Sequence, residues 1–372
     1  MEEKHNGNDE INQPELFSIG IEEEFQVVNP DTRELCSRVD NIMGRGILAM
    51  GSSLKPEFHS SMLETVSGIC GDMGEARNKI SHNRKLLSDF IKESGMNLAS
   101  AGTHPFSCWE DQHIYPAIHF QKIENEFREI ALSALTFALH IHIGITEKET
   151  ALHVINGMRP YLPVILALSA NSPFHRGRDT GFMSFRSVVY PRFPRSGIPR
   201  HFTSYRQYKE YIDTLKKTGC IKSPGEVWWD ARIHPFYETI EIRLCDAQTE
   251  INETLAIAAL VQALSYRIYL DYMSGKKFPH IDRSLIEENR WRAGRRGLDC
   301  NIVDFQKKEE IPCREVIRGI LDYVSGVVDK LKCKEDLEYV REMLNKGTGA
   351  NRQLEAYKKS GDIGDVVDLL MV

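Results

Sequence analysis

The stretch LFSIGIEEEFQVV (residues 16–28) places three consecutive glutamates inside an otherwise apolar segment. Alternate side chains of a β-strand point to the same face, so Glu22 and Glu24 share one face. The apolar residues around them predict that this strand belongs to a core sheet. Two carboxylates on one face of such a strand repel each other and lose solvation, so they need a cation or an arginine between them. An edge strand whose glutamates face water is the alternative that this stretch leaves open.

The stretch LHIHIG (residues 139–144) repeats the pattern with imidazoles. His140 and His142 share one face of the expected strand, and the two isoleucines share the other. Neutral imidazole is a common metal ligand, and the glycine that follows lets a ligand come close. A buried histidine that is only hydrogen-bonded is the alternative. Position on the strand does not decide which of the two histidines is the ligand.

Two further stretches carry charged residues on apolar strands. In KPEFHSSMLETVSG, Glu64 lies in a strand-like run where an unpaired charge is costly, whereas solvation is an alternative for Glu57. In TIEIRL, Glu241 and Arg243 share a face opposite three aliphatic side chains. One interpretation is an ion pair that satisfies only itself. The other is a metal-binding carboxylate beside a phosphate-binding guanidinium.

Taken together, four separate strands put ionisable groups on one face and aliphatic groups on the other. A carboxylate-rich sheet face is the expected lining of a site for a hard cation. Carboxylates outnumber imidazoles and no cysteine lies among them, which favours Mg²⁺, or Mn²⁺, over Zn²⁺. The sequence has no P-loop motif, no Rossmann glycine motif and no nucleophile elbow. A nucleotide would therefore be bound through metals and arginines on a sheet.

Two segments supply the arginines for such a site. Residues 172–202 hold six arginines, four prolines and three glycines, which predicts a long functional loop. Residues 288–297 add four more arginines. We expect only two or three of these side chains to contact a nucleotide, and the candidates are Arg186, Arg290 and Arg295.

Strands and helices are mixed without a regular βαβ alternation, which predicts an α+β fold on a largely antiparallel sheet. Residues 1–14 are polar and acidic and are expected to form a disordered leader, followed by a single domain at 15–372. Further strands are expected at 96–101, at 138–145 and in two runs within 226–245. Helices are expected at 72–94, 117–135, 149–170 with a bend at its prolines, 204–218 and 252–273, and in short pieces from 284 onward.

Composition limits the classes of partner. The 372 residues include 47 Lys+Arg and 53 Asp+Glu, so the net charge of −6 gives no basic surplus for nucleic-acid binding. The longest uncharged apolar run, 161–170, is too short for a membrane span. Small molecules are the expected partners, and a homodimer is left open. With no secretory signal and no CxxC pair among eight cysteines, we expect a cytoplasmic protein with reduced thiols.

The motifs as a set resemble the type 2 glutamate–cysteine ligase family, also called carboxylate–amine ligases. They are long, they follow in order, and they spread over roughly residues 16–355. The set is specific for the family but not for the substrate. The matching stretches are GIEEEF (20–25), LETVSG (63–68), AGTHPF (101–106), LHIHIG (139–144), DTGFMSFRS (179–187), WWDARIHPFYETIEIRLCDAQT (228–249), ENRWRAGRRGLD (288–299) and GTGANRQ (347–353).

The resemblance implies a glutamine-synthetase-like fold, in which a curved antiparallel sheet flanked by helices forms an active-site funnel. It also implies an ATP-dependent ligase that joins a carboxylate to an amine through an acyl phosphate, with glutamate and cysteine as the family's namesake pair. By this resemblance Glu241 and Arg243 are catalytic, and Arg243 contacts the transferred phosphate. The alternatives are a metal-dependent hydrolase and a non-catalytic homologue that binds Mg-ATP. The metal ligands implied are Glu22, Glu24, Glu57, Glu64, His142 and Glu241.

Overall fold

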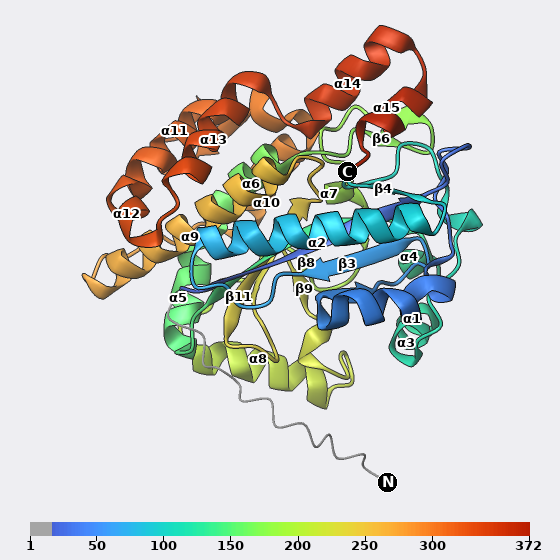
Figure 1. Ribbon diagram of the computed structural model, residues 1–372. Coiled ribbons are helices and arrows are strands. Elements are labelled where there is room, and N and C mark those ends of the chain that lie inside the picture. Colours follow the sequence, from blue (N-terminus) through green and yellow to red (C-terminus); the bar gives the residue numbers. More distant parts are fainter. Residues whose placement is uncertain (1–16) are drawn as a thin grey trace.

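A seven-stranded sheet forms the centre of the protein in this computed structural model, which describes residues 17–372 (Figure 1). The predicted leader at 1–14 lies outside the described residues. The strand order is β10-β11-β5-β1-β3-β2, with β4 also paired to β1, and every pairing is antiparallel. The predicted α+β fold on an antiparallel sheet is therefore confirmed. The strands are β1 (Ile19–Val28), β2 (Leu54–Pro56), β3 (Met62–Val66), β4 (Asn97–Ala99), β5 (Ala138–Gly144), β10 (Ala231–Ile233) and β11 (Thr239–Asp246).

Helices and three small two-stranded pairings surround this sheet (Figure 1). The small pairings are β6 (Phe174–His175) with β7 (Arg178–Asp179), β8 (Ser196–Gly197) with β9 (Trp228–Trp229), and β12 (Asn301–Asp304) with β13 (Glu309–Pro312). The helices are α1 (Val39–Met50), α2 (Met73–Glu93), α3 (Ile118–Phe127), α4 (Glu129–Leu132), α5 (Lys148–Met158), α6 (Leu162–Ser169), α7 (Arg186–Val189), α8 (Tyr205–Lys217), α9 (Ile251–Met273), α10 (Arg283–Arg296), α11 (Cys313–Val324), α12 (Val328–Leu331), α13 (Lys334–Lys346), α14 (Gly349–Ser360) and α15 (Ile363–Leu369).

The register of the sheet brings the predicted polar residues onto one face. Strand β1 lies between β5 and β3, so the alternative of an edge strand for GIEEEF is wrong. Residues directly opposite each other in an antiparallel pair point to the same side, which aligns ionisable groups from four strands. The Cα partners are Glu22 with His140, Glu24 with Glu64, and Glu241 with His142.

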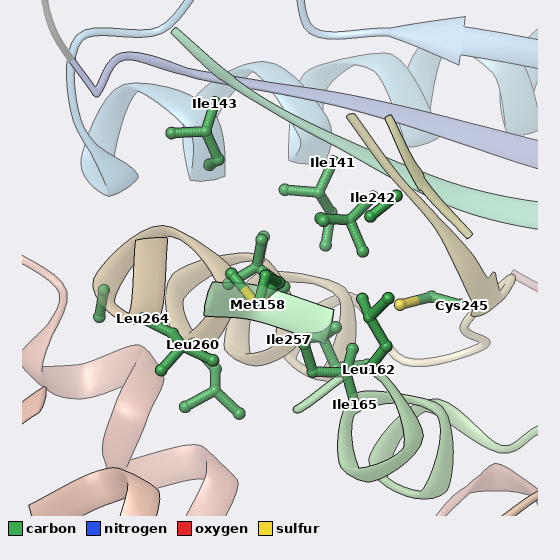
Figure 2. Packing of buried hydrophobic residues seen from close by; sticks show 14 of the residues in the cluster. Ile141, Ile143, Met158, Leu162, Ile165, Ile242, Cys245, Ile257, Leu260 and Leu264 are labelled. Atoms are coloured by element: carbon green, nitrogen blue, oxygen red, sulfur yellow. The ribbon is translucent and has the colours of Figure 1, made fainter. Parts of the chain in front are cut away.

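The other face of the sheet is aliphatic and packs against helices. Figure 2 shows Ile141, Ile143 and Ile242 from the sheet gathered with apolar side chains of α5, α6 and α9. All of these residues belong to one buried cluster, so removal of apolar surface from water holds the helices against this face. The polar face is thereby left for the site. The helix residues labelled in Figure 2 are Met158, Leu162, Ile165, Ile257, Leu260 and Leu264.

One helical stretch among the described residues, Lys148–Ser169, is long and apolar enough to cross a membrane by length and composition. Buried positions make up 78% of its most apolar window. It comprises α5 and α6, joined by a 3₁₀ turn at Arg159–Tyr161, as the prolines predicted. Its side chains supply a large share of the core, which is the behaviour of a core helix in a folded domain.

The structure adds to or differs from the expected elements at three places. The helix expected at 117–135 is divided into α3 and α4, because Arg128 adopts φ 49° and ψ −123°, outside the helical region. Helix α1 was not expected at all. The C-terminal part is not purely helical, since β12 and β13 form a hairpin whose turn contains Lys308 at φ 59°.

Candidate active site

The polar face carries three groups of side chains that could each hold a metal ion. Within each group the donor atoms lie within 4.8 Å of one another. The groups overlap, because Glu22 and Glu64 each belong to two of them. All six predicted ligands take part, and His140 joins them. The groups are Glu22–Glu64–His140, Glu22–His142–Glu241 and Glu24–Glu57–Glu64.

Glu22 lies at the centre of this arrangement. Its Oε2 atom is 3.4 Å from Nδ1 of His140 and 3.5 Å from Nε2 of His142. Burial alone would raise the pKa of Glu22, but the two imidazoles outweigh it and hold the pKa well below its usual range. Glu22 is therefore a carboxylate that is available to a cation.

Glu57 and Glu64 are crowded by their neighbours. Burial, followed by repulsion from Glu22, raises the pKa of Glu64 to about 7 despite the charge of Lys55. Burial and the charges of Glu64 and Glu24 raise the pKa of Glu57. A divalent cation among these oxygens would offset their repulsion and favour the ionised forms. Glu57 is half-buried beside Glu24 and Glu64, and its role as a ligand stays a prediction.

Two arginines hold Glu241 in place. Nε of Arg232 donates to Glu241 Oε2 at 2.5 Å, and Arg243 donates to Oε1. Burial would raise the pKa of Glu241, but Arg243 and Arg232 outweigh it and hold the pKa well below its usual range. Arg243 also donates to the hydroxyl of Tyr190 at 3.2 Å. The guanidinium of Arg243 is thus fixed at the edge of the metal-binding groups.

His142 supplies an observation that fits a bound metal. Its Nδ1 atom lies 3.0 Å from Oγ1 of Thr239, whereas its Nε2 atom is buried and has no hydrogen-bond partner among residues 17–372. Nε2 faces Glu22 at 3.5 Å and Glu241 at 4.0 Å. Ligands of one Mg²⁺ ion lie roughly 3–4 Å apart, because each is about 2.1 Å from the ion. The donors present therefore fit a cation of this kind.

A cavity of about 650 Å³ lies over the polar face. This volume is in the range of small-molecule sites. Its charged lining comprises the five glutamates, Lys55 and three arginines, Arg186, Arg232 and Arg243, beside His140. Aromatic side chains form part of the remaining wall. Aromatic lining residues include Phe58, Phe120, Tyr190, Phe193, Trp228, Phe236 and Tyr237.

The three arginines predicted to contact a nucleotide lie in different places. Arg186 lines the cavity, but its two terminal nitrogens donate to backbone oxygens of Arg243 and Leu244. Arg290 is buried, is paired with Asp230 at 2.6 Å and does not line the cavity. Arg295 is exposed and lies over the ring of Phe182 at 5.6 Å. The structure therefore brings only Arg186 to this cavity.

Sequence reasoning missed two cations at the site and one buried ion pair. Lys55 lies 3.0 Å from Glu64, opposite it in the β2–β3 pair, and Arg232 lies opposite Glu241. The middle glutamate of GIEEEF, Glu23, points away from the site and pairs with Arg84 of α2 at 2.6 Å. Strand alternation was a sufficient signal for Glu23, because it predicts the face opposite Glu22 and Glu24.

The family model described as glutamate–cysteine ligase family 2 matches residues 18–368, which include every residue of this site. The chain belongs to this family. A Solibacter usitatus protein described as a candidate glutamate–cysteine ligase 2 is 41% identical over 356 residues, 95% of this chain and 92% of that protein. A Herpetosiphon aurantiacus protein of the same description is 41% identical over 355 residues, with the same coverage of 95% and 92%.

Solved structures agree with this family in fold. A glutamate–cysteine ligase from Francisella tularensis, solved in complex with AMP, matches with a TM-score of 0.70 at 12% identity, over 96% of this chain and 88% of that chain. A bifunctional glutathione synthetase from Pasteurella multocida matches with a TM-score of 0.67 at 14% identity, over 95% and 51% of the two chains. The predicted ligase fold is confirmed, and the family identifies this chain as an ATP-dependent carboxylate–amine ligase.

Proposed function

We propose that this member of glutamate–cysteine ligase family 2 joins the carboxylate of glutamate to the amine of cysteine, with ATP cleaved to ADP and phosphate. The observation that carries the proposal is the polar sheet face, where three overlapping groups of metal ligands lie beside a fixed arginine on one cavity wall. The names of the relatives support the choice of substrates.

In the proposed reaction the substrate carboxylate attacks the γ-phosphate of ATP and forms an acyl phosphate, and ADP leaves as the bond between the β- and γ-phosphates breaks. The amine then attacks the acyl carbon, and phosphate leaves. Both steps develop charge on phosphoryl oxygens. Arg243, oriented by Glu241 and Tyr190, stabilises that charge without having to reorganise. Mg²⁺, or Mn²⁺, held by the six predicted ligands would supply further charge neutralisation at the phosphates.

A metal-dependent hydrolase that uses the same side chains is the second candidate. It would release product without consuming ATP. A non-catalytic homologue that binds Mg-ATP is disfavoured by the family of the chain, whose relatives are described as ligases. Two statements stay predictions from the sequence: the cytoplasmic location, and the exclusion of nucleic-acid and membrane partners. A homodimer stays open.

The function is tested by measuring ADP release with a panel of amino acids and amines. We expect ADP only when a carboxylate and an amine are both present, with glutamate and cysteine giving the fastest release. Chelation of divalent cations should lower the rate by about 100-fold or more, and added Mg²⁺ should restore it. Product formation without ADP would favour the hydrolase, and full activity in excess chelator would overturn the metal assignment.

His142 and His140 should differ as metal ligands. His142→Ala should weaken Mg-ATP binding, measured by calorimetry, by about tenfold or more. His142→Ala removes Nε2, a buried nitrogen without a hydrogen-bond partner in the described part of the chain. His140 instead lies at hydrogen-bond distance from Glu22 through its Nδ1 atom. His140→Ala is the matched variant, and both proteins should keep the wild-type circular dichroism. A larger loss for His140→Ala would reverse the assignment.

A further inference from the structure

Arg243 lies at an irregularity of strand β11. The register between β11 and β5 shifts between Ile242 and Cys245, so Arg243 and Leu244 leave the regular ladder. Such a bulge redirects a side chain, but it also leaves backbone groups without their ladder partners. Buried backbone groups need other partners, and those partners determine where the bulge lies.

Arg186 supplies partners for the two carbonyl groups of the bulge. Its two terminal nitrogens donate to the carbonyl oxygens of Arg243 at 3.0 Å and Leu244 at 3.1 Å. The side chain is buried, and its planar fork suits two acceptors at once. The N–H of Arg186 donates to Oγ of Ser172, which donates to Asp246 at the end of the same strand. Arg186 is therefore held against β11 at two places.

Arg290 is linked to the same bulge through Asp230, the residue before β10. Its Nε donates to a carboxylate oxygen of Asp230 at 2.6 Å, and another nitrogen donates to the carbonyl of Ser187 at 3.1 Å. The carbonyl of Asp230 in turn accepts the N–H of Arg243 at 2.8 Å. The carbonyl of Arg243 is thus held by Arg186 itself. Its amide is held by Asp230, whose side chain pairs with Arg290.

We propose that Arg186 and Arg290 are positioning residues that set the β11 bulge and act through Arg243. This inference rests on the proposed function, in which Arg243 stabilises the transferred phosphoryl group. It departs from the expectation that both arginines contact the nucleotide. Direct contact with the nucleotide is the competing role for Arg186. This side chain lines the cavity, and its Nε has no hydrogen-bond partner among the described residues. Arg290 does not line the cavity, so the competing role does not apply to it.

The first test separates positioning from nucleotide binding. Arg186→Lys and Arg290→Lys keep the charge but lose the fork that serves two acceptors. We expect kcat for ADP formation to fall about 10- to 100-fold in each, while the Kd of Mg-ATP, measured by calorimetry, changes less than about threefold. Arg178→Lys, an exposed arginine of the same segment, is the control with wild-type kinetics. A tenfold weaker Mg-ATP affinity with unchanged kcat would overturn the proposal.

The second test asks whether the arginines act through Arg243. In an Arg243→Ala background, Arg186→Lys and Arg290→Lys should lower kcat by less than about threefold more, because the side chain that they position is gone. Losses that multiply would show an independent role and would overturn the proposal. All variants should keep the wild-type circular dichroism. Should Arg186→Lys unfold, Ser172→Ala replaces it, since it keeps the guanidinium but removes the hydroxyl that accepts the Arg186 N–H and donates to Asp246.

These outcomes also separate the inference from the function beneath it. If wild-type protein binds Mg-ATP but releases no ADP with any carboxylate and amine, the proposed function fails. If wild-type protein releases ADP and the lysine variants match it in kcat, only the positioning role fails.

Discussion

Replacing Glu22 by glutamine should lower the rate of ADP formation by about 10²- to 10⁴-fold, the largest loss expected for one conservative change at the site. Glu22 contributes an oxygen to two of the three metal-binding groups, once with His140 and Glu64 and once with His142 and Glu241. An amide keeps the shape but removes the charge that both groups share. Several kcal/mol of transition-state stabilisation is therefore lost.

The variant should also need more metal. Raising the Mg²⁺ concentration should restore part of the activity of Glu22→Gln, because the remaining donors still define the groups. Glu57→Gln removes a ligand from one group only, so its loss should be smaller. Glu34→Gln, on the exposed turn after β1, should leave the rate unchanged. A folded Glu22→Gln protein with a rate within threefold of wild type would contradict the role of Glu22 as a ligand that two metal-binding groups share.

Local periodicity predicted the polar sheet face because it depends only on neighbours along the chain. Side chains of a strand alternate with period two, so GIEEEF, MLETV, LHIHIG and TIEIRL each reveal which residues share a face. The burial of the aliphatic faces then requires that these strands belong to one sheet. The family resemblance added Glu57 and chose His142 over His140, and all six ligands lie in the three groups found in the structure.

Residues that depend on pairing between distant strands could not be predicted in this way. Lys55 and Arg232 lie at the site because β2 pairs with β3 and β10 pairs with β11, and register is a property of the fold. Arginine content likewise showed where guanidinium groups are abundant but not what they contact. Arg186 donates to backbone carbonyls and Arg290 to Asp230, and these contacts join segments that lie far apart in the sequence.

Breaking the buried ion pair between Glu23 and Arg84 should destabilise the fold by about 3–5 kcal/mol. Both side chains are buried, and they join the central strand β1 to helix α2 at 2.6 Å. Arg84 also donates to the carbonyls of Gln248 and Thr249, next to the start of α9. Removing either partner leaves an uncompensated charge among apolar side chains, which is the reason for the large cost.

Urea denaturation of Glu23→Leu, Arg84→Met and the double variant measures this cost. Each single change should lower the free energy of unfolding by about 3–5 kcal/mol, whereas the double variant should recover part of that loss because no charge is left buried. Lys209→Met breaks an exposed pair with Asp213 on α8 and should leave the free energy of unfolding nearly unchanged. Equal costs for the buried and the exposed pair would contradict the structural role of Glu23, the middle glutamate of GIEEEF.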